Sequence, residues 1–234
     1  MLHHIKELYG NTLAASDGAI GHVKDFYFDD QTWVIRYLVA ETGTWLPGRL
    51  VLLSPHAFGQ WDEDGKTLPI KLHKQQIQDS PSIESHRPVS RQYEEEYYLY
   101  YGWPAYWDGG AMGGIAGFPV ATSVSTPEKL LHHSQNQQDD IHLRSCRSVT
   151  GYHIQATDGA IGSVSGFQLD VKSWTIRELV VEAGPWYSGK EILISPAKIA
   201  RISYEQSSVF VNLTQADIRH TAENHVAKIG AGSR

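Results

Sequence analysis

The sequence predicts an all-β (mainly β) protein made of two small six-stranded β-barrels related by internal duplication. Three observations lead to this prediction. Residues 17–55 return at residues 158–196 without a gap, and 20 of the 39 positions are identical. The offset of 141 residues is too long for a solenoid and is typical of two complete domains. Within each copy, short runs of β-branched and aromatic residues alternate with turn residues at the spacing of a small barrel.

Turn signals divide the first copy into six expected strands. These are residues 7–15, 22–28, 33–41, 49–53, 58–62 and 67–72. The pairs Asp17-Gly18 and Asp64-Gly65 and the run 29–32 supply turns, because Asp and Gly readily adopt turn conformations. The second copy repeats the plan over residues 149–213.

The strand over residues 33–41 does not alternate cleanly between apolar and polar positions. Ile35 and Val39 share one face, while Val34 and Leu38 share the other. A sheet with one face in water would have polar residues at one of the two parities. We therefore expect both faces to be covered, the outer one by the other barrel, a terminal helix or the linker, so that the copies pack as a pseudo-symmetric pair.

Each copy is expected to close with a short helix. In the second copy Thr214 is a suitable N-cap, Asp217 follows three residues later as in a capping box, and Ile218 would be buried. In the first copy His73 takes the place of the cap and Pro81 limits the helix.

The segment between the copies differs from them in composition and is expected to be a partly helical aromatic linker. Ser90 can cap a helix, and Gly102 and Pro104 can end it. One stripe of this helix would carry four tyrosines: Tyr93, Tyr97, Tyr100 and Tyr101. The polar tract 132–140 is the best candidate for a disordered link.

These patterns divide the chain into four parts. We expect a first barrel over residues 1–81, a linker over 82–140, a second barrel over 141–225 and a flexible tail over 226–234.

Composition restricts the class of protein. The formal net charge is −6 and basic residues form no stripe, so nucleic-acid binding is not expected. The single cysteine, Cys146, excludes an intramolecular disulfide, suits a reducing compartment and is expected to be buried. We expect no signal peptide, and the weakly polar run 109–124 is too short to span a bilayer. A cytoplasmic location is therefore expected.

Three short motifs occur in register in both copies. They are Asp-Gly-Ala-Ile-Gly at 17–21 and 158–162, Trp-x-Ile-Arg-x-Leu-Val at 33–39 and 174–180, and Leu-x-Ser-Pro at 52–55 and 193–196. This pattern resembles the PRC-barrel family, and the linker motif at 100–107 is similar to one in stand-alone bacterial proteins with two such barrels. The resemblance implies six-stranded barrels used for protein–protein contact or assembly, and it supplies no catalytic residues.

Arg36 and Arg177 occupy equivalent mid-strand positions and are the candidate anion contacts. Structural ion pairs with the nearby Glu41 and Glu182, or cross-strand contacts, are favoured over an anion site. The alternative stays open: exposure of both arginines in a concave site would support anion binding, whereas burial in ion pairs would oppose it.

The densest aromatic cluster of the chain lies in the linker and supplies the candidate partner contacts. These are Tyr97, Tyr100, Tyr101, Trp103, Tyr106 and Trp107. They either cover the outer face of a barrel or form an exposed recognition surface, since Tyr and Trp provide large contact areas at low entropic cost.

No motif of a metal site, nucleophile elbow, P-loop or dinucleotide site is present, although the chain has 12 histidines. We therefore expect no cofactor, no metal and no catalytic residue. The expected function is a non-enzymatic protein–protein interaction or assembly module, either a monomer or a weak homodimer, with a protein partner. The alternatives are a small-molecule or anion-binding protein that uses the cleft between the barrels, and an enzyme such as a hydrolase.

Overall fold

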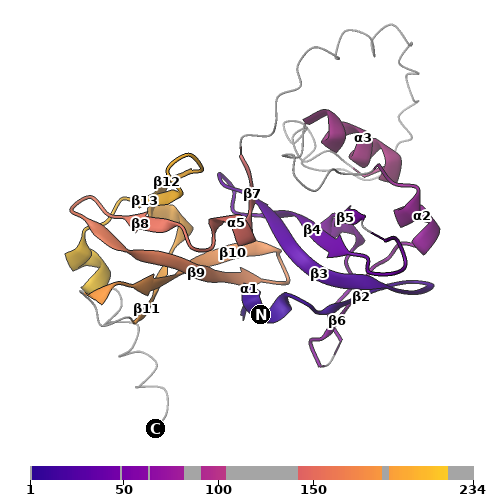
Figure 1. Ribbon diagram of the computed structural model, residues 1–234, viewed down its shortest axis with the longest axis horizontal. Coiled ribbons are helices and arrows are strands. Elements are labelled where there is room, and N and C mark those ends of the chain that lie inside the picture. Colours follow the sequence, from indigo (N-terminus) through magenta and orange to yellow (C-terminus); the bar gives the residue numbers. More distant parts are fainter. Residues whose placement is uncertain are drawn as a thin grey trace, which may run out of the picture.

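The computed structural model describes residues 2–47, 49–62, 64–81, 91–103, 142–185 and 190–220. The protein is mainly β, with two sheets that lie side by side along the long axis of the molecule (Figure 1). No helix within these residues has the length and apolar character needed to cross a bilayer.

Five strands of the first sheet come from the first sequence copy. They are β2 (Thr12–Ala15), β3 (Gly18–Asp29), β4 (Ile35–Glu41), β5 (Leu50–Leu53) and β6 (Thr67–Pro69). Their order is β5-β4-β3-β2-β6, with β2 and β6 parallel and the other pairs antiparallel. The 3₁₀ helix η1 (Pro55–Ala57) follows β5, and the helix α2 (Lys74–Gln78) follows β6.

The second sheet has the corresponding strands and one more. They are β8 (His153–Gln155), β9 (Ala160–Asp170), β10 (Thr175–Ala183), β11 (Glu191–Ile194), β12 (Ile199–Ser203) and β13 (Ser208–Val211). Their order is β11-β10-β9-β8-β13-β12, and the 3₁₀ helix η4 (Pro196–Lys198) joins β11 to β12. Residues 215–220 are helical, and Thr214 and Asp217 form the expected reciprocal cap.

Several expected elements are confirmed and others are wrong. The hairpin across residues 29–32 is present as β3 and β4. The closed six-stranded barrels are not found, since both strand paths are open within the described residues. Residues 58–62 form only an isolated bridge from Phe58 to Ile70. The opening strand expected over residues 7–15 is shorter than expected, because β2 begins at Thr12.

A helical turn, α1 (Ile5–Leu8), replaces the beginning of that expected strand. Ile5 and Leu8 are both buried, and their spacing of three residues brings both side chains to the same side of a helical turn. In a strand, residues three apart point to opposite faces, so burial of both side chains on one side favours the helical turn.

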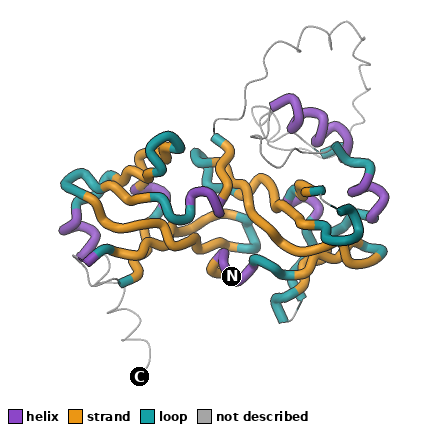
Figure 2. Tube along the Cα trace, in the orientation of Figure 1, coloured by secondary structure: helices purple, strands orange, loops and turns teal. Residues whose placement is uncertain are grey.

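The two halves exchange their first strands. β1 (Leu2–His4) pairs with β9 of the second sheet, with Leu2 opposite Asp170. β7 (Leu143–Ser145) pairs with β3 of the first sheet, with Leu143 opposite Asp29. The two registers correspond at the offset of 141 residues. Helices α1 and α5 (Cys146–Val149) follow the exchanged strands and lie in the middle of the molecule, where the sheets meet (Figure 2).

A second backbone link lies at the centre of this arrangement. Val34 and Thr175, which are equivalent by the same offset, form a β-bridge with each other. Ile35 N donates to Trp174 O and Ile176 N donates to Trp33 O, both at 2.8 Å. Trp33 and Trp174 have positive φ values of 60° and 52°, an uncommon conformation for a bulky residue that the reciprocal bonds hold in place.

The hydrophobic core is continuous across the two halves. One cluster of buried residues includes side chains from both sheets. The ring centroids of Phe28 and Phe167 are 5.5 Å apart, and those of Phe58 and Trp174 are 4.6 Å apart. Burial of each such ring contributes about 2–3 kcal/mol to folding. The exchanged strands, the central bridge and the shared core therefore make the two sheets one body.

Helix α3 (Arg91–Tyr101), from the linker, covers the outer face of the first sheet. Tyr97 and Tyr98 pack on Tyr37, Val39 and Leu52 of β4 and β5. The opposite face of β4 lies in the shared core. Both faces of this strand are therefore covered, as expected, and the linker helix is one of the covers. The expected pairing of faces is wrong, because a register shift next to Ile35 places it in the shared core with Leu38, apart from Val39.

Candidate binding clefts

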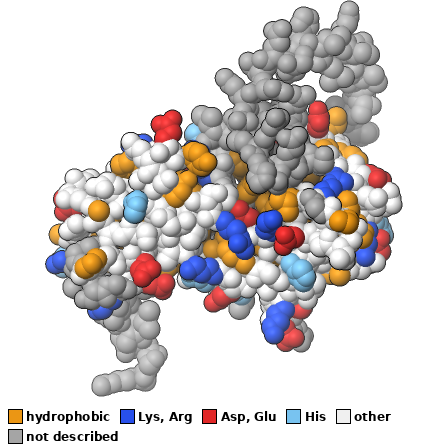
Figure 3. Space-filling view, in the orientation of Figure 1, with side chains coloured by type: hydrophobic (Ala, Val, Ile, Leu, Met, Phe, Trp, Pro, Cys, Tyr) orange, Lys and Arg blue, Asp and Glu red, His pale blue; other side chains and the backbone are white. Residues whose placement is uncertain are grey.

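Two clefts lie where the halves meet. The first, here called the polar cleft, has a volume of about 570 Å³ and lies between Asp30, Gln31, Trp33, His142 and Arg144 on one side and residues from Pro196 to Ile202 on the other. The second, here called the aromatic cleft, has a volume of about 900 Å³ and its lining includes Phe58, Trp61, Trp174, Lys172 and His3. Charged groups of both signs are interspersed on the face shown in Figure 3.

The clefts are counterparts in the fold. Trp33 lines the polar cleft and Trp174 the aromatic cleft, and these residues are equivalent at the offset of 141. The same offset relates Pro196 to Pro55 and Ile199 to Phe58. Each cleft has walls from both halves, so its shape depends on how the halves are joined.

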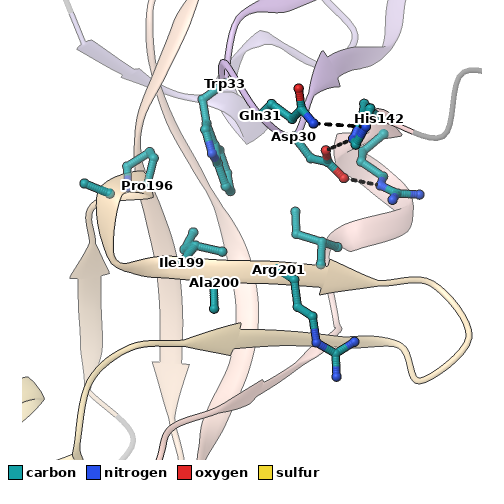
Figure 4. A pocket seen from close by; sticks show the side chains of 11 residues that line it. Asp30, Gln31, Trp33, His142, Pro196, Ile199, Ala200 and Arg201 are labelled. Carbon is teal, nitrogen blue, oxygen red and sulfur yellow. Dashed lines mark hydrogen bonds and ion pairs between the residues drawn. The ribbon is translucent and has the colours of Figure 1, made fainter.

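The polar cleft carries a connected set of hydrogen-bonding side chains (Figure 4). His142 Nδ1 lies 2.9 Å from Asp30 Oδ1, and Arg144 Nε donates to Asp30 Oδ2 at 2.7 Å. Gln31 Nε2 lies 3.0 Å from His142 Nε2. The geometry suits a neutral imidazole that donates from Nδ1 to the carboxylate and accepts from the Gln31 amide at Nε2. One charged wall is thus oriented before any ligand binds.

The aromatic cleft lacks the counterpart of this network. Val171 stands at the position of Asp30, and Lys172 and His3 stand at the positions of Gln31 and Arg144. Its apolar surface comes largely from aromatic rings. The indole Nε1 of Trp61 is buried and has no hydrogen-bond partner within the described residues. The two clefts therefore present different chemistry at equivalent places.

A buried carboxylate positions the strand that brings Arg144 to the polar cleft. Ser145 Oγ donates to Asp25 Oδ2 at 2.5 Å, and the backbone N–H groups of Arg147 and Phe26 donate to Oδ1 at 3.1 and 2.7 Å. Burial raises the pKa of Asp25 above its ordinary value, and these three hydrogen bonds oppose the rise. Asp25 thus attaches β7 and α5 to β3.

The arginines that the sequence singled out line neither cleft. Arg36 donates to Asp29 Oδ2 at 3.2 Å, and Arg177 donates to Asp170 Oδ2 at 3.3 Å. Both ion pairs join the two strands of a hairpin. The expected type of contact is therefore present, but the partners are these aspartates and not Glu41 and Glu182.

The linker aromatics are mostly engaged with the first sheet. Tyr97 is fully buried, its hydroxyl donating to Leu52 O and accepting from Ser54 N, both at 3.0 Å. The rings of Tyr101 and Trp103 are stacked with centroids 4.5 Å apart, and both residues are partly buried. Tyr100 is 43 % exposed. Tyr106 and Trp107 lie outside the described residues.

Metal-binding and thiol chemistry find little support in the described part of the chain. No group of three or more His, Cys, Asp or Glu side chains there could hold a metal ion. Cys146 is buried, as expected, and burial raises the pKa of its thiol. The lining of the polar cleft includes no Ser, Thr or Cys side chain that could act as a nucleophile.

Sequence reasoning missed the four residues that define the polar cleft: Asp30, Gln31, His142 and Arg144. A signal was available, because at three of these positions the equivalent position of the other copy has a different residue type. The pairs are Asp30 and Val171, Gln31 and Lys172, and Arg144 and His3. Attention to residues shared by both copies selected the positions that maintain the fold. A scan against protein-family models and a search of curated proteins find no match to the chain.

Proposed function

We propose that this chain is a non-enzymatic interaction module built on two PRC-like halves, each an open sheet within the described residues, and that a partner polypeptide binds at a cleft between the halves. The observation that carries the proposal is the reciprocal exchange of β1 and β7. It joins the halves into one body and sets two clefts of unlike lining at equivalent places. Concave sites that exist before binding reduce the ordering cost of association.

The chemistry of the polar cleft supports binding more than catalysis. Its carboxylate, imidazole and guanidinium groups hydrogen-bond one another, which fixes their orientation. Such an arrangement recognises a complementary polar surface. A hydrolase would need a nucleophile or an activated water beside a base with one ring nitrogen available, whereas His142 bonds Asp30 through Nδ1 and Gln31 through Nε2.

A matched pair of variants tests the proposal. Gln31→Trp would fill the polar cleft, and Lys172→Trp would place the same side chain at the equivalent position of the aromatic cleft; both native residues are exposed. The immobilised chain and both variants are used to capture partners from a cell extract, with quantitative mass spectrometry. We expect a partner that one variant loses and the other retains.

Two results would count against the proposal. Enrichment of no protein by the unchanged chain would contradict an interaction role. A partner retained by both variants but lost by Tyr100→Ala would move the interaction from the clefts to the exposed side of α3.

A second candidate function is binding of a small anion in the polar cleft. Arg144, Arg36 and Arg177 each bind an aspartate, but of the three Arg144 alone lines a cleft between the halves. Inorganic phosphate should then raise the melting temperature of the chain but not that of Arg144→Gln. An equal response of both proteins would exclude this candidate.

A further inference from the structure

The strand β12 forms a free sheet edge. It is the last strand of its sheet and pairs only with β13 among the described residues. Ala200 and Arg201 in this strand are exposed. An antiparallel edge strand directs the N–H and C=O groups of alternate residues away from its neighbour, where an added strand can bind them.

The polar cleft follows this edge. Its lining includes four consecutive residues, Ile199 to Ile202. The pairing of β12 with β13 shifts register between Ile199 and Arg201, so the strand alternates regularly only from Arg201 to Ser203. Asp30 and Trp33 stand across the cleft from β12 (Figure 4). Beside the aromatic cleft the equivalent segment, residues 58–62, is not a strand. Of the two clefts at the junction of the halves, the polar cleft is therefore the one that lies beside an edge strand within the described residues.

The side chains of β12 define which strand would fit. Arg201 projects away from the Asp30 wall (Figure 4). Its guanidinium carbon lies 3.8 Å from the ring centroid of Phe210. The guanidinium group contacts Gln206 Oε1 at 3.5 Å, and no carboxylate within the described residues pairs with it. Ile202 is buried on the other side of the strand. An acidic residue beside Arg201 and apolar residues on the Ile202 side would complement this pattern.

We propose that the polar cleft binds an extended peptide segment that adds as a strand to the free edge of β12. The segment is about five residues long, the length of β12, and carries an acidic side chain beside Arg201. This inference rests on the proposed function and names the class of partner. A second copy of the chain fits this edge less well than a short peptide. In each copy Asp30 stands across the cleft from β12, so pairing two β12 strands edge to edge would bring the two Asp30 walls into collision.

Blocked heptapeptides and the isotope-labelled full chain test the proposal by nuclear magnetic resonance. The probe is acetyl-Thr-Thr-Val-Glu-Val-Thr-Thr-amide, with the central Glu replaced by Lys in a second peptide. Two further peptides are N-methylated, one at the central residue and its second neighbours and one at the two valines. We expect the probe to shift the amide signals of residues 199–203.

Strand addition predicts that one N-methylation pattern weakens binding at least about tenfold and the other is tolerated, since only alternate N–H groups of the peptide face β12. The Lys peptide should bind about two- to fivefold more weakly. Arg201→Glu should reverse this preference, while Lys66→Glu, an equal charge change on an exposed turn of the first half, should leave it unchanged.

Other outcomes overturn the inference. The first is that both N-methylated peptides bind equally well, and the second is that the probe shifts signals away from β12. The third is that the peptides cause no shift at millimolar concentration and a random heptapeptide display library yields no sequence whose binding depends on β12. Concentration-dependent dimerisation abolished by Arg201→Glu would assign the edge to a second copy. Capture of a partner from extract despite failed peptides would leave the interaction role intact and remove strand addition alone. Strand addition by the peptides with no partner captured would support the site and contradict the cellular role.

Discussion

The two exchanged strands are held by different chemistry, and this difference shows which positions serve the fold and which serve a site. Where β7 lies on β3, Asp25 accepts a hydrogen bond from Ser145. At the equivalent place on β9 stands Gly166, and a Cβ there would come within 2.5 Å of the His4 ring of β1. The first attachment is polar and the second is a close approach of a ring to the backbone.

The clefts beside these strands differ in the same way. The half that has Asp25 and Ser145 also has Asp30 and Arg144, which make the polar cleft. Residues identical in both copies, such as the glycines at 21 and 162, maintain the shared scaffold. Residues that differ between equivalent positions give each cleft its chemistry.

The shared scaffold should be the most sensitive part. A Cβ at Gly21 would lie 2.0 Å from Glu41 O, and one at Gly162 would lie 2.0 Å from Glu182 O. Gly21→Ala and Gly162→Ala should each lower the free energy of unfolding by about 3 kcal/mol or more, measured by urea denaturation, because the clash is with backbone. Gly21→Ala should cost more, since φ at Gly21 is +137°. Gly43→Ala, with positive φ but open space, should cost only about 1 kcal/mol; similar losses for all three would refute the close-approach argument.

The buried carboxylate should respond in the opposite direction. Asp25→Asn can keep all three hydrogen bonds if its amide donates to Ser145 Oγ, and it removes the cost of a buried charge. The free energy of unfolding at pH 7 should rise by about 1–2 kcal/mol. A loss of similar size would show that the charge stabilises the attachment of β7.

The pH dependence of the same variant has a defined sign. Because the pKa of Asp25 is raised in the folded state, the folded chain binds more protons between the ordinary value of 3.8 and the raised one. The contribution of Asp25 to stability therefore falls as pH rises through this window. The stability advantage of Asp25→Asn should be present at neutral pH and disappear as pH falls toward 3.8; a constant advantage from pH 4 to 7 would contradict the assignment.

The twin ion pairs should show a smaller difference. The side chains of Arg36 and Asp29 are 15 % and 13 % exposed, whereas that of Arg177 is 52 % exposed. Arg36→Ala should lower the free energy of unfolding by about 1 kcal/mol, because the pair is partly shielded from water. Arg177→Ala should have the weaker effect. Equal losses in parallel denaturation curves would show that exposure does not separate the two pairs.

The smallest effect is expected at the wall of the polar cleft. Arg144→Gln breaks the ion pair with Asp30 and should lower the free energy of unfolding by about 0.5–1 kcal/mol. His3→Gln, the equivalent change beside the aromatic cleft, should have no resolvable effect on thermal unfolding. A larger loss of stability for His3→Gln than for Arg144→Gln would contradict this expectation. It would mean that the attachment of β1 depends more on the residues next to it than the attachment of β7 does.

The sequence predicted those parts of the fold that local patterns determine. The turn at Asp29 to Thr32 and the β-branched residues around it were sufficient for the β3–β4 hairpin. The lack of alternation around Ile35 was sufficient for burial of both faces of β4. The cap at Thr214 was readable because a capping box lies within four residues.

The exchange of strands could not be predicted in this way. Leu2–His4 and Leu143–Ser145 share only their leucine, so the repeat is weak where the exchange occurs. Their partners are more than 100 residues distant in the chain. The polar cleft was missed for the same reason, because Asp30 and Arg144 come together only when β7 leaves its own half.

The most direct test of the interlocked halves is to cut the chain between them and ask whether they separate. A protease site is inserted between residues 104 and 141, the purified chain is cleaved, and the product is applied to a size-exclusion column under native conditions. The exchange of β1 and β7 predicts that both fragments elute together at the position of the uncut chain and separate only in denaturant. Two folded fragments eluting apart in native buffer would contradict it.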